Sequence, residues 1–192
     1  MDLMKVFAIL VMVVFYTSYF SKMLLQRKQG VQTDQIGKGK KPKNVLLVER
    51  LMKLVTYGIV PVEVVSILGG VPLRNNALCW TGLGIASLGV TVFLAAMITM
   101  GVSWRAGIPE TDKTELVTGG IYRFSRNPAF LGFDLMYIGL LIAWFNWVHL
   151  LFAACAVILL HLQILQEEAF LRNTFGNAYV EYQNRTGRYF IM

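Results

Sequence analysis

Apolar residues in this sequence gather into five long runs, and polar residues are concentrated between them. An apolar helix of about 20 residues can cross the hydrocarbon core of a bilayer, which is about 30 Å thick, whereas irregular backbone cannot, because its polar groups would find no partners there. The pattern therefore predicts an all-α fold, a multi-pass transmembrane helical bundle of about five spans. The five runs are Leu3 to Tyr19, Val55 to Gly70, Ala77 to Val102, Ala129 to Trp144 and Trp147 to Leu165.

The composition supports a membrane protein. Of the 192 residues, 56% are hydrophobic and only 15% are charged, a balance at which a soluble domain would aggregate. It also excludes a disordered chain. Cys79 and Cys155 lie in separate apolar runs, which indicates packing residues and not a disulfide scaffold. Because little chain is left outside the runs, any chemistry must take place in the polar connections and at the end of the last run.

Basic residues lie in alternate connections. Eight of the 18 lysines and arginines lie in or beside the connection between the first two runs, four lie between the third and fourth, and three follow the fifth. The positive-inside rule then places the N-terminus outside or in the lumen and the C-terminus in the cytoplasm, in either the cell membrane or the endoplasmic reticulum. Topology and anionic headgroups explain the net charge of +7, so we expect no nucleic-acid partner. The first run lacks a clear cleavage site and precedes a basic cluster, which favours a span over a signal peptide.

The chain divides into two parts near residue 100. Residues 1–100 hold the first three runs and a basic loop, Gln29 to Lys43, that we expect to be mobile and cytoplasmic. Residues 101–192 begin with a polar connection, Ser103 to Asn127, which is longer than two spans need. Loops of this length are often functional, so we expect the C-terminal half to form a cytoplasmic binding pocket.

Small residues and short connections predict how the runs pack. Gly82, Ala86 and Gly89 in the third run let a neighbouring backbone approach closely. The fourth and fifth runs are joined by little more than Asn146, which predicts a tight antiparallel hairpin. The fifth run continues without a helix breaker through Glu167–Glu168, so these two carboxylates lie where the helix leaves the membrane.

The first candidate for chemistry is the end of the long connection. Gly119–Gly120 permits close backbone approach, and the ring of Tyr122 offers a surface on which a flat ligand could stack. Pro128 suits the first turn of the next helix, whose free N–H groups favour an anion such as a ligand carboxylate. A membrane-surface re-entry with Arg126 bound to headgroups is the alternative.

The second candidate is the Glu167–Glu168 pair. Adjacent side chains on a helix point about 100° apart, so the two carboxylates have different neighbours, and Gln163 lies one turn before Glu167. Carboxylates that lose hydration need a cation, which could be Arg126, Arg172 or a cationic ligand. Plain solvation of the helix surface remains the alternative.

Other polar residues in the runs carry less specific signals. Asp134 should face the bundle interior or a water-filled cavity, because an ionised carboxylate is costly in hydrocarbon, and Glu63 invites the same interpretation more weakly. We expect His149 at the interface and His161 in a hydrogen-bonded core position. No metal-ligand spacing, nucleophile elbow or Walker loop is found, so we expect no metal, hydrolysis or ATP use.

An ordered set of motifs in the second half resembles the isoprenylcysteine carboxyl methyltransferase family and its phospholipid methyltransferase relatives. The resemblance covers roughly residues 101–192. The motifs are Leu116-Val117-Thr118-Gly119-Gly120-Ile121-Tyr122, Arg126-Asn127-Pro128, Glu167-Glu168, Phe175-Gly176, Tyr179, Tyr182 and Thr186-Gly187-Arg188.

The resemblance implies a five-span bundle whose C-terminal half binds S-adenosylmethionine near the cytoplasmic surface. It implies catalytic roles for Arg126 and Glu167 and an acceptor side at Gln163 and Asp134. The family commonly has His where this chain has Asn127 and Arg where it has Gln163, which leaves the acceptor open. The implied cofactor contacts are Thr114, Glu115, Leu116, Val117, Gly120, Tyr122, Asn127, Pro128, Ala129, Phe130, Glu167 and Glu168.

The implied reaction is transfer of a methyl group to a lipophilic or prenylated acceptor from the bilayer, most simply a carboxylate. A carboxylate is already ionised at neutral pH and needs no general base, and a water-poor site favours a reaction that joins an anion to a cation. On this hypothesis Glu167 orients the cofactor, and Arg126 either pairs with Glu167 or holds the acceptor. The alternatives are N-methylation of a phospholipid or other amine, with Asp134 or Glu168 in the acceptor pocket, an NADPH-dependent membrane reductase, and a protein without catalysis.

Overall fold

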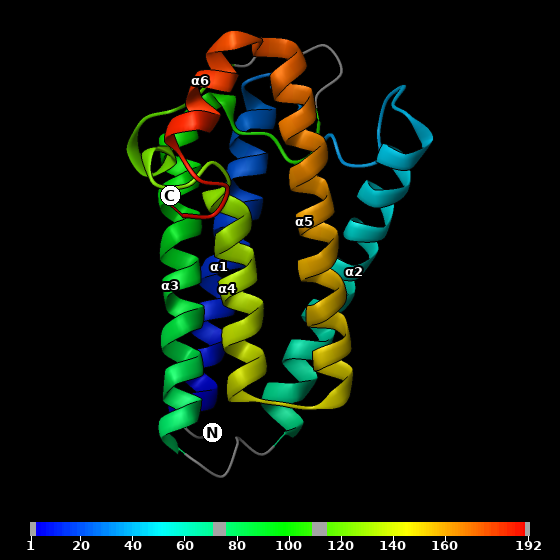
Figure 1. Cartoon of the computed structure of the whole chain (residues 1–192). Coiled ribbons are helices and arrows are strands. Elements are labelled where there is room, and N and C mark those ends of the chain that lie inside the picture. Colours follow the sequence, from blue (N-terminus) through cyan, green and yellow to red (C-terminus); the bar gives the residue numbers. More distant parts are fainter. Residues whose placement is uncertain (1–2, 71–75, 109–114, 191–192) are drawn as a thin grey trace.

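The computed structural model describes residues 3–70, 76–108 and 115–190, and its regular elements are helices joined by irregular connections (Figure 1). Within these residues, strand structure is limited to one isolated bridge between Asp34 and Ala106, so the predicted all-α fold is confirmed. The helices are α1 (Leu3–Lys28), α2 (Lys43–Gly69), α3 (Asn76–Met100), α4 (Pro128–Ala143), α5 (Trp147–Phe175) and α6 (Asn177–Arg185), with 3-10 turns η1 (Gly101–Ser103) and η2 (Gly120–Arg123).

Four of the helices, α1, α2, α3 and α5, are long and apolar enough to cross a membrane. Their length and composition fit an integral membrane protein. The helix α4 is also apolar but has only 16 residues. At 1.5 Å per residue it rises roughly 24 Å, less than the core of a typical bilayer.

The helices pack mainly as two pairs, α3 with α4 and α2 with α5, and α1 lies against α3 (Figure 1). Glycines account for the closest pair. A Cβ atom added to Gly82 would lie 2.5 Å from the carbonyl oxygen of Gly139, and one added to Gly89 would lie 2.6 Å from that of Gly132. The predicted close approach at Gly82 and Gly89 is therefore confirmed, with α4 as the partner.

The turn between α4 and α5 is as short as expected, but the two helices do not form a tight hairpin. Each makes more contacts with another helix, α4 with α3 and α5 with α2. Glycines on both α3 and α4 let that pair approach more closely than α4 and α5 can. In the turn, Asn146 caps α5 by accepting a hydrogen bond from the backbone N of His149 at 2.9 Å.

The loop after α1, which the sequence predicts to be mobile, is held by a buried ion pair. Glu49 is fully buried and accepts hydrogen bonds from Lys41 Nζ at 2.8 Å, from Gly37 N at 2.7 Å and from Ile108 N at 3.2 Å. We call Gly37, Lys41, Glu49 and Ile108 the Glu49 clasp. A buried carboxylate requires such donors, and here they come from two different connections, which it holds together.

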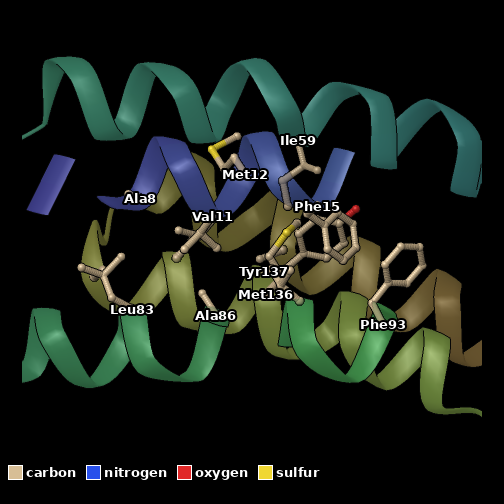
Figure 2. Close-up of a cluster of buried hydrophobic side chains, with 14 of the residues drawn as sticks. Ala8, Val11, Met12, Phe15, Ile59, Leu83, Ala86, Phe93, Met136 and Tyr137 are labelled. Atoms are coloured by element: carbon tan, nitrogen blue, oxygen red, sulfur yellow. The ribbon is translucent and has the colours of Figure 1, made fainter. Parts of the chain in front are cut away.

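The core between the helices is apolar and rich in aromatic rings. Side chains from four helices meet there, among them Phe15, Ile59, Phe93 and Tyr137 (Figure 2). Many large apolar side chains point outward instead; Trp147 is 76% exposed. Outward apolar surface of this extent is what lipid contact requires.

Candidate active site

A cavity of about 430 Å³ lies among α1, α2, α4 and α5. Its lining is mostly aromatic and aliphatic, and its charged residues are Lys53, Arg105 and Glu167. Residues of α1 and α2 form much of the wall, so the cavity is not made by the C-terminal half alone. The lining includes Tyr16, Tyr19, Phe20, Ile36, Met52, Thr56, Tyr57, Val60, Pro61, Phe93, Trp104, Ala106, Gly107, Ala129, Phe130, Phe133, Tyr137 and Leu160.

Glu167 is placed on the wall of this cavity by α5. Gln163, one turn earlier on the same helix, donates from Nε2 to Glu167 Oε1 at 3.0 Å. Gln163 is itself fully buried and is not part of the lining. Ala129 and Phe130, from the first turn of α4 and predicted like Glu167 to contact the cofactor, line the same cavity. The cavity therefore brings together three of the residues singled out in the sequence.

Glu168 faces a different set of partners. Its Oε1 accepts from Arg126 Nη2 and from Asn127 Nδ2, both at 3.0 Å, and its Oε2 accepts from Arg188 Nη2 at 2.9 Å. We call Arg126, Asn127, Glu168 and Arg188 the Glu168 network. It joins the exit of α5 to the start of α4 and to the C-terminal segment. The hydrogen bond to the Glu168 carboxylate also raises the pKa of Arg188 above its ordinary value.

Arg126 pairs with Glu168 and not with Glu167, the pairing that the sequence analysis offered as one possibility. Arg126 binds Glu168 and also donates to the backbone carbonyls of Gln183 and Thr186. Arg172, the other suggested cation, donates to Gln183 Oε1 at 2.9 Å. The sequence separated the two carboxylates correctly by helical geometry but missed Arg188 as a partner. The place of Arg188 in the Thr186-Gly187-Arg188 motif was the sequence signal that could have identified this partner.

The connection before α4 ends at an aromatic cluster of Tyr122, Tyr179 and Tyr182, on which Leu116 and Val117 pack. Tyr182 donates from its hydroxyl to the carbonyl of Tyr122 at 2.7 Å. Burial, together with the carboxylate of Glu168, raises the pKa of Tyr179 to about 12, so this side chain is neutral at physiological pH.

Gly120 and the start of α4 have the local geometry that the sequence suggested. Gly120 has φ +55° and packs on Thr99, where a Cβ would lie 2.7 Å from Cγ2. Pro128 begins α4, and the Asn127 amide binds Glu168, so the first turn of α4 has no side-chain cap. Glu115 is exposed, and Thr114 lies outside the described residues.

The remaining polar candidates lie away from the cavity lining. Asp134 faces the bundle interior as expected, with 8% exposure and no hydrogen bond to Oδ1 from the described residues. Burial and the Asp134 carboxylate both raise the pKa of Tyr189. The hydroxyl of Tyr189 lies 2.6 Å from His161 Nδ1, which confirms a hydrogen-bonded position for His161. His149 is fully buried beneath the turn and is not exposed at an interface.

Within residues 3–70, 76–108 and 115–190, no group of three His, Cys, Asp or Glu side chains could hold a metal ion. The family model described as phospholipid methyltransferase matches residues 77–178, slightly more than half of the chain. The chain belongs to this family. The phospholipid methyltransferase match begins with α3, so it includes the α3–α4 pair as well as the two carboxylates of α5.

Two relatives confirm the resemblance to isoprenylcysteine carboxyl methyltransferases. The chain is 31% identical over 108 residues to the protein-S-isoprenylcysteine O-methyltransferase of Schizosaccharomyces pombe, which covers 55% of this chain and 46% of the relative. It is 32% identical over 109 residues to protein-S-isoprenylcysteine O-methyltransferase B of Arabidopsis thaliana, with 54% of each chain covered. The chain thus spans about half the length of the curated relatives it matches.

Proposed function

We propose that this protein is an integral membrane methyltransferase that uses S-adenosylmethionine to methylate a lipophilic or prenylated acceptor, most simply at a carboxylate. The observation that carries the proposal is the position of Glu167, a carboxylate on the wall of a large apolar cavity that Ala129 and Phe130 also line. The names of the two relatives support the reaction type.

The residues present fit this cofactor. When bound, S-adenosylmethionine supplies an electrophilic methyl group on a sulfonium centre. Glu167 forms no ion pair with any described residue, so its carboxylate is available to hold a positive group. The first turn of α4, which begins at Pro128, has no side-chain cap and offers N–H groups to a carboxylate. Glu167 would hold the positive end of the ligand and the first turn of α4 its carboxylate, so together they would also fix its orientation.

The cavity suits a lipophilic acceptor whose reacting group is anionic. Its walls are aromatic and aliphatic, and two of its three charged lining residues, Lys53 and Arg105, are basic, with Lys53 also paired to Asp34 at 3.2 Å. An amine acceptor must lose a proton to a base before it reacts, whereas a carboxylate is ionised already. Apolar walls also exclude water, which strengthens the attraction between opposite charges in the site.

N-methylation of a phospholipid or another amine is the second candidate. Gln163 stands where the isoprenylcysteine enzymes have an arginine suited to a substrate carboxylate, and the matched family is that of phospholipid methyltransferases. Methyl label transferred to lipid extracts separates the two candidates. Base-labile label indicates an ester, and base-stable label indicates an amine.

Calorimetry on the detergent-purified protein tests the proposed cofactor. We expect S-adenosylmethionine and S-adenosylhomocysteine to bind and NADPH not to bind. Glu167→Gln should weaken binding of S-adenosylmethionine by about tenfold or more, because one charge-assisted contact is lost. Glu181→Gln, at an exposed position of α6, is the matched control and should change nothing. Binding of NADPH alone would overturn the proposal in favour of a reductase.

A further inference from the structure

The deep end of the cavity contains a group of polar side chains inside the apolar bundle. Tyr16 of α1 donates from its hydroxyl to Glu63 Oε2 of α2 at 3.3 Å. Glu63 Oε1 and the hydroxyl of Tyr137 of α4 have no hydrogen-bond partner among the described residues. Glu63 and Tyr137 are both fully buried. We call Tyr16, Glu63 and Tyr137 the Tyr16 cluster.

The Tyr16 cluster is costly if packing is its only role. A buried polar group without a hydrogen bond loses its contacts with water and gains nothing in return, and a carboxyl group inside a membrane helix marks a functional site by default. Among the described residues, no lysine, arginine or histidine forms an ion pair with Glu63. Tyr16 and Tyr137 both line the cavity, whereas Glu63 is not part of the lining, so a molecule in the cavity could form hydrogen bonds with the two tyrosine hydroxyls.

The cavity therefore has polar groups toward both of its ends, and Tyr19, Thr56 and Tyr57 add hydroxyl groups to a lining that is otherwise mostly apolar. Asn127, at the start of α4, binds Glu168, so Ala129 and Glu167 lie toward the same end of the cavity. Tyr137 follows Ala129 by eight residues on α4, a rise of roughly 12 Å. Phe133 and Leu160 lie on the lining between these two levels. In binding sites of this kind, apolar walls supply the affinity and a few polar groups fix the orientation of the ligand.

We propose that the cavity selects an acceptor with two polar ends, in which a hydroxyl group lies about 12 Å from the reacting group and binds the Tyr16 cluster. The inference rests on the proposed function, because it takes Glu167 to mark the reacting end. A hydroxyl both donates and accepts, and so can pair with the hydroxyls of Tyr16 and Tyr137, which line the cavity. A cationic group would lose much more hydration free energy inside the bundle than a neutral hydroxyl does.

The test uses N-acetylcysteines with S-alkyl chains of eight, ten or twelve carbons, each ending in a methyl, a hydroxyl or an amino group. Binding is measured by calorimetry and methyl transfer by label from S-adenosylmethionine. We expect a hydroxyl end to be preferred over a methyl end by about tenfold at one chain length, in binding and in kcat/KM. Tyr137→Phe should abolish the preference.

A purely structural role of Tyr137 predicts a different result. Removing an unpaired hydroxyl should leave thermal stability unchanged or raised, so lost preference in a stable variant reports on the ligand. Tyr57→Phe, at an exposed cavity residue outside the cluster, is the matched control and should keep the preference.

The outcomes for the two proposals are distinguishable. Transfer to methyl- and hydroxyl-ended probes at equal efficiency would overturn the inference and leave the proposed function in place. A preference for the amino end would also overturn it. If no probe is methylated but the hydroxyl end still binds better in a Tyr137-dependent way, the cavity inference holds and the proposed methyl transfer fails.

Discussion

At the scale of residues, the adjacent carboxylates of α5 have separate tasks. Glu168 is enclosed by two arginines and an amide and holds three segments together, whereas Glu167 has one hydrogen bond from its own helix and lines the cavity. The first arrangement stabilises the fold. The second leaves a negative charge for a ligand. A single helical step of about 100° produces this difference.

Substitution of Glu168 should therefore cost stability, and substitution of Glu167 should not. Glu168→Gln leaves the buried Arg126 without its counter-charge, so we expect the free energy of unfolding to fall by about 3 kcal/mol. Arg188 is more exposed and adds less to this loss. Thermal unfolding in detergent measures both variants. A Glu168→Gln protein as stable as Glu167→Gln would contradict this assignment.

Sequence reasoning could separate the two glutamates but could not name their partners. Helical periodicity is local, and it predicts that neighbouring side chains diverge. The contacts of Glu168 depend on Arg126, which lies 42 residues earlier in the chain, and on Arg188, which lies 20 residues later. Such contacts follow from how α4, α5 and the C-terminal segment meet. The cavity lining from α1 and α2 could not be predicted for the same reason.

At the scale of elements, glycines set the distance between α3 and α4. The sequence predicted a close approach at Gly82 and Gly89, and the structure adds matching glycines at positions 132 and 139. The prediction of a tight α4–α5 hairpin was wrong, because a short turn holds only the adjacent ends of two helices together. The faces with the smallest side chains decide which helices pack along their length.

Gly89→Ala tests this contact. The added Cβ would lie 2.6 Å from a backbone oxygen of α4, so the helices must separate, and we expect a loss of about 1–3 kcal/mol in the free energy of unfolding. Gly84→Ala is the control on the same helix, because nothing lies within 4 Å of a Cβ there. The control should be neutral or slightly stabilising. Equal thermal unfolding of the two variants would show that the close approach has no energetic role.

The Glu49 clasp is the second feature that holds whole elements in place. Lys41 and Glu49 are both buried, with 6% and 0% side-chain exposure, and they fix the connection between α1 and α2. Ile36 of this connection and Lys53 of α2 both line the cavity. Glu49 is one of two acids, with Asp34, among many basic residues in this segment, and that was the sequence signal for this anchor. Its partners could be found only from the fold.

Glu49→Gln should release the loop at residues 29–42. The substitution leaves Lys41 buried without a counter-charge, which costs about 3–5 kcal/mol. We expect faster limited proteolysis within this loop than in the wild-type protein. The double variant Glu49→Gln with Lys41→Met removes both charges and should recover part of the protection. Wild-type protection in the single variant would exclude the clasp as the anchor.

At the scale of the whole molecule, the ends of the helices support five crossings. Figure 1 shows the α4–α5 turn at the same end of the bundle as the N-terminus. Asn146 in that turn donates from Nδ2 to Ser66 Oγ at 2.8 Å, and Ser66 lies in the last turn of α2. The short α4 thus reaches the level at which the long α2 ends. Local thinning of the bilayer or a thin membrane accommodates a short helix at modest cost.

Cysteine labelling distinguishes five crossings from four. Three exposed positions, Lys40, Trp147 and Glu181, are each changed to Cys in a Cys155→Ser background, since Cys79 is buried. If α4 crosses, an impermeant maleimide should reach positions 40 and 181 from the same side of sealed vesicles, and position 147 from the other. If α4 does not cross, position 147 is labelled together with position 40, and position 181 lies on the opposite side. The second pattern would separate α6 from the loop at residues 29–42 by the membrane, and would contradict the packing of both against one end of the bundle.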